Sequence, residues 1–195
     1  TVPATYIADL ALTPQLDFSQ SAVNGKLTVR VNTVGETKGI TVEAIALADG
    51  KEVAHVKDAS FSASHSPARY PQREKLQLVP EEPIQGSPQN SASLQLVLIN
   101  PKLWSPGNPF LYDLIIRIKK DGKVLDEVKS YFGMRKVSVE KDADGHDRIF
   151  LNGEPYFNLG TLDQGFWPDG LYTAPTDEAL AFDIKAIKAM GFNTV

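Results

Sequence analysis

One short segment of the chain, residues 162–172, concentrates side chains of the kinds that bind sugars. Carboxylates and amides hydrogen-bond to hydroxyl groups, and an indole face packs against the C–H face of a pyranose ring. The candidate substrate-binding residues are Asp163, Gln164, Trp167 and Asp169. The alternative is that Trp167 and Tyr172 only pack this loop against the part of the chain that precedes it.

Three other clusters contain residue types found in catalytic or metal sites, but their sequence surroundings do not support such a role. Residues 142–147 resemble a calcium loop, but they lack the further ligands of an EF-hand and lie between two predicted hairpin arms. Glu81 and Glu82 occupy a proline-rich segment without the rigidity that a catalytic pair of carboxylates requires. Residues 64–66, a Ser-His-Ser run, have no orienting acid nearby. We therefore predict no catalytic residue, no metal site and no cofactor in this chain.

The composition narrows the classes of partner. The 195 residues include no cysteine, which excludes disulfides and thiolate metal sites. A net charge of -4 and the lack of a long basic tract argue against a nucleic-acid partner. No apolar run approaches the ~20 residues of a membrane helix, so we expect no membrane partner. None of these features indicates the cellular compartment.

The elements that must position the loop begin with short strands, which extend from residue 6 to about residue 151. Alternation of apolar and polar residues with a period of two is typical of half-buried strands. The clearest apolar rows are Leu27–Val29–Val31, Leu94–Leu96–Leu98 and Leu114–Ile116–Ile118. Asn-Gly and Asp-Gly dipeptides, which tolerate the positive φ angles of tight hairpins, separate the strands. The pattern predicts a sandwich or barrel of antiparallel strands.

Two regions of this part are less regular. Residues 40–47 begin with the same period and then shift phase near Ala44, as a bulge would explain. Residues 62–72 and 80–91 have no periodicity, and we assign them to long loops.

After Leu151 the pattern changes to that of a parallel sheet. Residues 155–159 read as a short apolar strand, a loop extends to residue 175, and residues 192–195 begin a second strand. Between them we predict a helix with Thr176 as its N-cap and Gly191 as its C-cap. Its apolar face comprises Leu180, Ile184, Ile187 and Met190. One βα step cannot cover this face, so we expect this chain to be part of a longer protein. In this chain alone, we expect residues 176–190 to be disordered, to self-associate with a neighbouring molecule, or to pack on the preceding strands.

Four segments, taken together, resemble the glycoside hydrolases of family 2, which include β-galactosidases, β-glucuronidases and β-mannosidases. They are Trp104–Tyr112 (WSPGNPFLY), Tyr131–Arg135 (YFGMR), Ile149–Pro155 (IFLNGEP) and Met190–Val195 (MGFNTV), with Asp183–Ile184 before the last. In that family the first motif leads into the penultimate sandwich strand, the second closes the sandwich, and the third opens the catalytic barrel. Residues 1–103 support the resemblance only through their strand pattern.

The resemblance implies a mainly β fold in two parts. Residues 1–140 would form an immunoglobulin-like β-sandwich, and residues 141–195 a linker hairpin and the first, truncated βα unit of a (β/α)8 TIM barrel. The whole protein would hydrolyse O-glycosyl bonds of β-linked sugars with retention, using two glutamates on later barrel strands. No residue of this chain matches those positions, so we expect the fragment itself to be inactive.

The carbohydrate substrate is left open by one departure from the family. Residues 163–170 resemble a D-Q-G-[YF]-W-P-D-G loop of uncharacterised members, whereas the better-known galactosidases have a histidine-containing loop here, so galactose specificity is not implied. The alternative to an enzyme is a stand-alone fibronectin-like or carbohydrate-binding sandwich without enzymatic role. That alternative explains residues 1–140 equally well, but it does not explain a βα unit entered through residues 151–153.

Overall fold

A computed structural model describes residues 3–19, 22–57, 61–64 and 89–195. The chain divides into two compact units, residues 1–136 and 137–195. Within the described ranges, no helix combines the length and the apolar character that a bilayer crossing requires.

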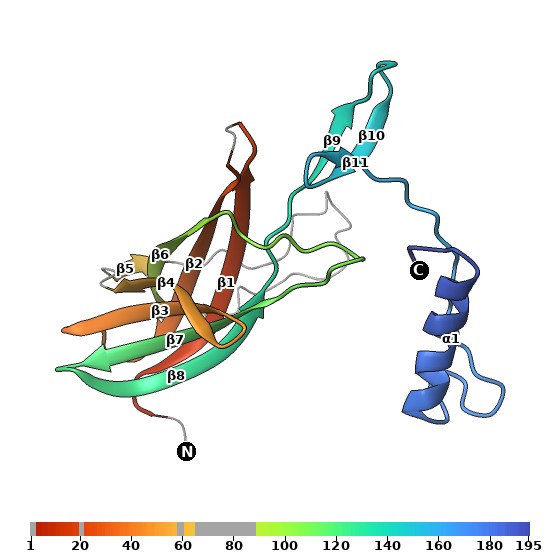
Figure 1. Cartoon of the computed structure of the whole chain (residues 1–195). Coiled ribbons are helices and arrows are strands. Elements are labelled where there is room, and N and C mark those ends of the chain that lie inside the picture. Colours follow the sequence, from red (N-terminus) through yellow and green to blue (C-terminus); the bar gives the residue numbers. More distant parts are fainter. Residues whose placement is uncertain (1–2, 20–21, 58–60, 65–88) are drawn as a thin grey trace, which may run out of the picture. The chain divides into compact units, whose positions relative to one another are not determined.

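The first unit contains two four-stranded sheets in which all paired strands are antiparallel (Figure 1). One sheet has the order β1-β2-β6-β5, formed by β1 (Tyr6–Asp17), β2 (Asn24–Val34), β6 (Gln89–Ile99) and β5 (Ser62–Ser64). The other has the order β4-β3-β7-β8, formed by β4 (Lys51–Lys57), β3 (Ile40–Ala48), β7 (Tyr112–Lys120) and β8 (Lys123–Phe132). This is the immunoglobulin-like arrangement of the predicted sandwich.

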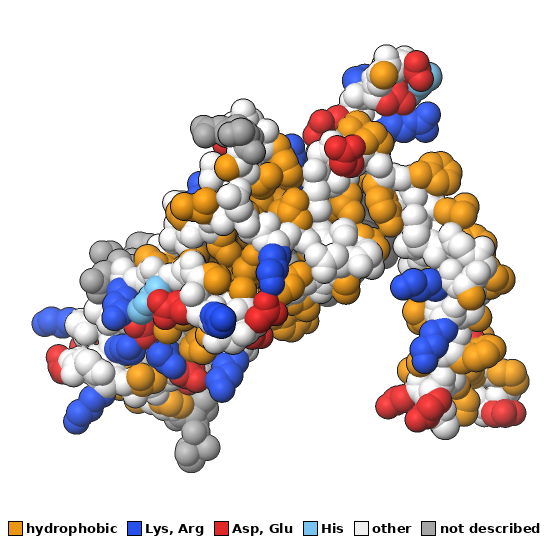
Figure 2. Space-filling model, in the orientation of Figure 1, with side chains coloured by type: hydrophobic (Ala, Val, Ile, Leu, Met, Phe, Trp, Pro, Cys, Tyr) orange, Lys and Arg blue, Asp and Glu red, His pale blue; other side chains and the backbone are white. Residues whose placement is uncertain are grey.

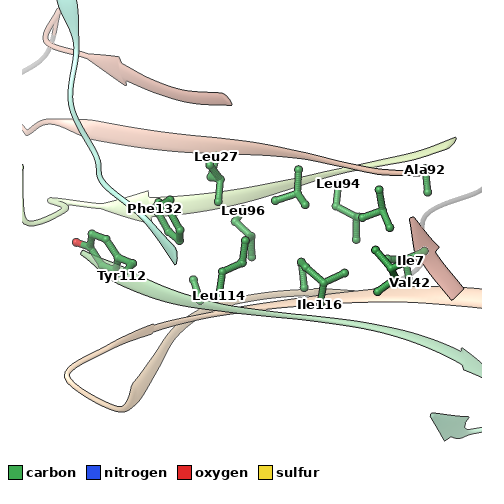
Figure 3. Packing of buried hydrophobic residues seen from close by; sticks show 14 of the residues in the cluster. Ile7, Leu27, Val42, Ala92, Leu94, Leu96, Tyr112, Leu114, Ile116 and Phe132 are labelled. Atoms are coloured by element: carbon green, nitrogen blue, oxygen red, sulfur yellow. The ribbon is translucent and has the colours of Figure 1, made fainter. Parts of the chain in front are cut away.

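The core lies between these sheets and is made of the predicted alternating rows. The three predicted rows, on β2, β6 and β7, are buried. Figure 3 shows labelled members of these rows, with Val42 of β3, pointing toward one another between the sheets. Phe132 stacks on Tyr112 at a centroid distance of 5.1 Å and extends the core toward one end. Burying a large aliphatic side chain contributes about 1.5–3 kcal/mol, so these rows hold the sheets together.

The irregular regions differ from the sequence prediction in detail. In β3 the core row continues through Val42, Ala44 and Ala46, and the register shift in its pairing with β4 falls later, between Ala46 and Leu47. The phase shift expected near Ala44 is therefore wrong. Ile45 points to the face of β3 opposite the core row, and it is buried because that face is covered as well. The predicted loops are wrong at residues 62–64 and 89–91, which pair as strands, and otherwise lie outside the described residues.

A half-buried tryptophan lies near the C-terminal end of the first unit. The backbone N–H of Trp104 donates to the Met134 carbonyl at 2.9 Å. The Arg135 guanidinium lies 4.5 Å from the centre of the Trp104 indole ring. A Cβ on Gly133 would come within 3.3–3.4 Å of the Trp104 side chain. The sequence motifs WSPGNPFLY and YFGMR thus meet in one packing cluster, in which glycine leaves room for the indole.

The second unit contains a small sheet and one helix. The sheet has the order β11-β10-β9, formed by β9 (Val137–Lys141), β10 (Asp147–Leu151) and β11 (Glu154–Pro155). The pairing of Val139 with Ile149 confirms the predicted hairpin arms. Helix α1 (Asp177–Ala189) follows a long connection. The strand predicted over residues 155–159 is wrong in its bounds, because Pro155 belongs to β11 and residues 156–159 are not part of a strand.

Candidate functional site

The candidate loop is held between two extended segments that lie side by side in parallel. Gly160 and Thr194 form a parallel bridge, and the Asn193 N–H donates to the Leu159 carbonyl at 3.0 Å. The Asn193 side chain adds two contacts: its Oδ1 accepts from the Leu159 N–H and its Nδ2 donates to the Phe157 carbonyl, both at 2.8 Å. The parallel pairing around helix α1 confirms the predicted βα unit.

Helix α1 begins where its capping residues predict. The Thr176 hydroxyl accepts from the Ala179 N–H at 3.2 Å, as an N-cap does. Hydrogen bonds from its own N–H and from Thr176 lower the pKa of the Glu178 carboxyl, which lies in the first turn. The predicted C-cap is wrong by one residue: Met190 is the C-cap, and Gly191 follows it with a φ of 92°, a conformation that favours glycine. These local signals fix the helix and hence the span of the loop.

Within the loop, backbone contacts define a tight turn. Trp167 and Leu171 exchange backbone hydrogen bonds of 2.7 and 3.1 Å. Inside this turn a Cβ on Gly170 would lie 2.1 Å from the Thr173 carbonyl oxygen, so only glycine fits without a backbone shift. Beside it, the rings of Phe166 and Tyr172 pack at a centroid distance of 4.7 Å. The loop therefore has its own internal packing.

A hollow of about 420 Å³ lies between the loop and the helix. Its lining residues are Thr161, Leu162, Asp163, Gln164, Phe166, Asp183, Ala186, Ile187 and Met190. Its volume falls in the range of about 300–1,000 Å³ that is usual for small-molecule sites. Figure 2 shows that apolar side chains gather over the helix and its loop. Apolar and hydrogen-bonding side chains thus face the same space, which suits the two kinds of surface on a sugar ring.

The structure separates the four predicted sugar-binding residues into two pairs. Asp163 and Gln164 line the hollow, and Trp167 and Asp169 do not. The Asp163 Oδ1 accepts from the Gly165 N–H at 2.8 Å, which fixes that carboxylate relative to the loop backbone. Trp167 is half-buried in the Trp167–Leu171 turn, and Asp169 is exposed.

Among the lining residues that were not predicted to bind sugar, Phe166 and Asp183 have the side chains best suited to it. Phe166 lies in the loop between the predicted residues Gln164 and Trp167, and its ring lines the hollow. Asp183 comes from helix α1, where it is half-buried and adds a second carboxylate to the lining. Its spacing from the helix residues Ile187 and Met190 could have indicated a shared face, because residues three or four positions apart are neighbours on a helix.

The Asp-rich turn between β9 and β10 has the geometry of a hairpin connection. Asp142, Asp144 and His146 offer atoms within 4.8 Å of one another. However, the Asp142 Oδ1 accepts from the N–H groups of Asp144 and His146 at 3.0 and 2.8 Å, and its Oδ2 accepts from the Arg148 side chain at 3.0 Å. These contacts, that of Arg148 first, lower the pKa of the Asp142 carboxyl. Both oxygens of this carboxylate already accept hydrogen bonds that stabilise the turn, and a metal ion would have to displace these donors.

A buried carboxylate in the sandwich was also missed by the sequence analysis. The Glu43 side chain is 5% exposed on the outer face of β3, surrounded by His55, Lys57, Arg117 and Lys119. Lys119 Nζ lies 2.5 Å from Oε2, and His55 Nε2 lies 2.9 Å from Oε1. Burial alone raises the pKa of Glu43, but hydrogen bonds from Lys119, His55 and Lys57 and the charge of Lys119 outweigh it and lower the pKa to about 2. The negative charge of Glu43 is thus balanced by basic side chains of the same sheet, which indicates a structural role for the cluster.

Comparison with known proteins gives consistent results. The family model described as "Glycosyl hydrolases family 2" matches residues 5–135, most of the first unit. A β-galactosidase of Oenococcus oeni is 29% identical over all 195 residues, and a β-glucuronidase of Formosa agariphila is 28% identical over 167 residues. These alignments cover 100% and 84% of this chain, but only 17% and 14% of the relatives. The chain thus spans about one sixth of their length.

Solved structures show the same fold. The β-glucuronidase of Bifidobacterium dentium complexed with coumarin-3-O-glucuronide superimposes with a TM-score of 0.69 at 22% identity, over 98% of this chain and 27% of that chain. A β-glucuronidase of Ruminococcus gnavus in complex with D-glucuronic acid gives a TM-score of 0.68 at 20% identity, over 98% of this chain and 26% of that chain. Because the family model covers more than half of the chain, this protein belongs to the family 2 glycosyl hydrolases.

Proposed function

We propose that a longer protein containing this chain hydrolyses O-glycosidic bonds of β-linked sugars, and that this chain is a non-catalytic part of it. The observation that carries the proposal is the family match over residues 5–135, followed in the same chain by a parallel βα unit. The relatives that align with both units are named β-galactosidases and β-glucuronidases. In this proposal residues 1–140 form the sandwich domain and residues 141–195 open the catalytic barrel.

The chemistry of a retaining glycosidase explains why this chain would not act alone. One carboxylic acid protonates the leaving oxygen, and a second carboxylate about 5–5.5 Å away attacks the anomeric carbon. Both must be held rigidly on opposite sides of the scissile bond. Asp163 and Asp183 line one hollow, but the first lies in a loop stabilised by its own turn and the second on a helix that has no buried residue. We assign neither a catalytic role.

The proposed role of the loop is contact with the sugar. Loops that follow the carboxyl ends of barrel strands form the active-site face in barrel enzymes. The loop here follows the extended segment that pairs through Gly160 with Thr194. Asp163 and Gln164 would accept and donate hydrogen bonds to hydroxyl groups, while Phe166 offers an apolar wall. Trp167 and Asp169 lie in the same loop outside this lining and remain candidates.

Turnover of nitrophenyl β-glycosides tests whether the longer protein is a glycosidase and whether this chain alone is inactive. The purified 195-residue chain should release no nitrophenol above the uncatalysed rate, whereas the longer protein should release it from at least one β-glycoside. Hydrolysis by the pure chain would contradict the non-catalytic assignment. Lack of hydrolysis of every β-glycoside by the longer protein would contradict the enzymatic assignment and favour a binding module.

We further propose that residues 176–190 offer the isolated chain a surface for self-association. Leu180, Ile184 and Met190 are each at least half exposed, although they belong to the apolar helix face. Sedimentation velocity over a range of protein concentrations measures this directly. A strict monomer at high concentration would contradict it.

A further inference from the structure

Two asparagines of the chain, Asn24 and Asn152, are followed by glycine. In an Asn-Gly pair the backbone nitrogen of the glycine reaches the asparagine side chain easily, because glycine has no Cβ to obstruct it. Attack of that nitrogen on the side-chain Cγ closes a succinimide ring, and the side-chain NH2 group leaves with the glycine N–H proton as ammonia. Water then opens the ring to aspartate or isoaspartate. The reaction needs no reagent other than water, so the structural setting decides which of the two sites reacts.

The fold immobilises the first of these sites. Asn24 belongs to the inner strand β2, where it pairs with Asp17 of β1 on one side and with Ile99 of β6 on the other. Gly25 is buried, and a Cβ placed on it would lie 2.7 Å from the Met134 side chain. The Gly25 nitrogen can therefore turn onto the Asn24 side chain only if β2 leaves both neighbouring strands.

The second site lies in a hairpin turn with much less support. Asn152 and Gly153 form the turn between β10 and β11, with φ angles of 54° and 85°, which Asn-Gly pairs adopt readily. Asn152 is partly exposed and Gly153 is exposed. Strand β11 is two residues long, lies at the edge of its sheet and pairs only with β10. Opening this turn therefore disturbs a short edge pairing and no buried core.

We propose that Asn152 is a site of spontaneous deamidation that loosens the β10–β11 turn, whereas the fold protects Asn24. Edges and turns open at a small cost in free energy, while core strands open only when the whole domain unfolds. We expect Asn152 to react at least about tenfold faster than Asn24 in the folded chain, which corresponds to ~1.4 kcal/mol between their opening free energies.

The loosening follows from the structure of the product. Isoaspartate continues the main chain through its side-chain carboxyl group, which inserts an extra carbon into the turn, and it adds a carboxylate close in sequence to Glu154. The hairpin continues beyond β11 through the Tyr156 N–H, which donates to the Ile149 carbonyl at 2.8 Å. Hydrogen exchange of the Tyr156 amide should therefore be faster in the deamidated chain.

Peptide mapping by mass spectrometry tests the site on the full chain. The protein is incubated in mildly alkaline buffer, once folded and once in guanidinium chloride, and the replacement of amide by acid is followed at both asparagines. In the denaturant the two sites should react at similar rates, because their chemistry is alike. In the folded chain Asn152 should still react, while the reaction at Asn24 should be suppressed.

Variants assign the product and its effect. Asn152→Gln should abolish the acidic product of the folded chain, because the longer side chain must close a larger ring. Asn24→Gln is the matched control and should leave the rate at Asn152 unchanged. Asn152→Asp adds the charge without the extra backbone carbon, so its Tyr156 amide should exchange more slowly than that of the isoaspartate form.

The outcomes separate the two parts of the proposal. Equal rates at the two sites in the folded chain, or a folded state that suppresses Asn152 as strongly as Asn24, would overturn the deamidation site. Deamidation at Asn152 without faster exchange of the Tyr156 amide would overturn the loosening and leave the modification site standing.

Discussion

The two units of this chain obey the same local rules but differ in how much of their apolar surface is covered. Residues 3–136, where described, bury a continuous core, whereas in residues 137–195 Phe150 alone is buried. The strands of the first unit find partners on both sides of the core. Helix α1 has its cap, its acidic first turn and its apolar face, yet none of its residues is buried.

The difference shows that local sequence signals determine where a helix or strand forms, but not whether its apolar face is buried. A helix forms where caps and propensities favour it, but most helix stability in proteins comes from tertiary packing. The free energy of unfolding should therefore depend strongly on apolar side chains of the first unit and weakly on those of the second. The same substitution, made in both units, is the direct test of this comparison.

The largest effect is expected from Leu114→Ala in β7. Leu114 is 0% exposed at the centre of the core, so its truncation leaves a cavity that the sheets fill only in part. We expect a loss of about 2–5 kcal/mol in the free energy of unfolding, measured by urea titration with tryptophan fluorescence. A loss below ~1 kcal/mol would show that the sandwich does not depend on this core as described.

The next effect concerns the charge cluster around Glu43 and depends on pH. Its folded-state pKa of about 2 lies below the ordinary value of 4.5, so the carboxylate stabilises the fold above pH 4.5 and this stabilisation is lost as the pH falls toward 2. Because the surrounding cations are partly exposed, we expect a contribution of about 1–3 kcal/mol. The free energy of unfolding, followed from pH 7 to pH 2.5, should show this decline.

Glu43→Gln separates this carboxylate from the others. The variant should be less stable at pH 7 and should lose less stability on acidification than the wild type. Glu52→Gln is the matched control, since Glu52 lies on the same face but is more than half exposed, and it should change little. If Glu43→Gln and the wild type lose the same stability between pH 5 and pH 2.5, Glu43 is not the titrating group.

Features that depend on near neighbours in the sequence were predictable, and those that depend on register were not. The buried rows through Leu27 and Leu114, and the Thr176 cap, follow from spacing alone. The burial of Glu43 depends on which cations of β4 and β7 lie beside it, which only strand register decides. Asp183 joins the hollow for a similar reason, because the loop folds back onto the helix from a different part of the chain.

A smaller, local effect is expected from Asn193→Ala in the second unit. The substitution removes two side-chain hydrogen bonds of 2.8 Å to the segment around Leu159, while the backbone bond between these residues remains. Exposed hydrogen bonds contribute about 0.5–1.5 kcal/mol each at most, so we expect about 1 kcal/mol of local destabilisation. Hydrogen exchange of the Leu159 amide should accelerate accordingly, without a change in the sandwich amides.

The control for this pairing is Asn158→Ala, which removes one contact, from the Thr194 hydroxyl at 3.3 Å. Its effect on the Leu159 amide should be smaller than that of Asn193→Ala. Equal exchange rates in both variants would show that Asn193 does not hold the two segments together.

The smallest effect is expected from Leu180→Ala, the counterpart of Leu114→Ala. Leu180 is 50% exposed, and alanine has a helix propensity at least as favourable as that of leucine, so the two changes nearly offset. We expect a change within about 0.5 kcal/mol, measured by the same urea titration at low protein concentration. A loss comparable to that of Leu114→Ala would mean that this helix face is covered in solution. Repeating the titration at several protein concentrations would then show whether a second copy of the chain covers it, because stability gained by association rises with concentration.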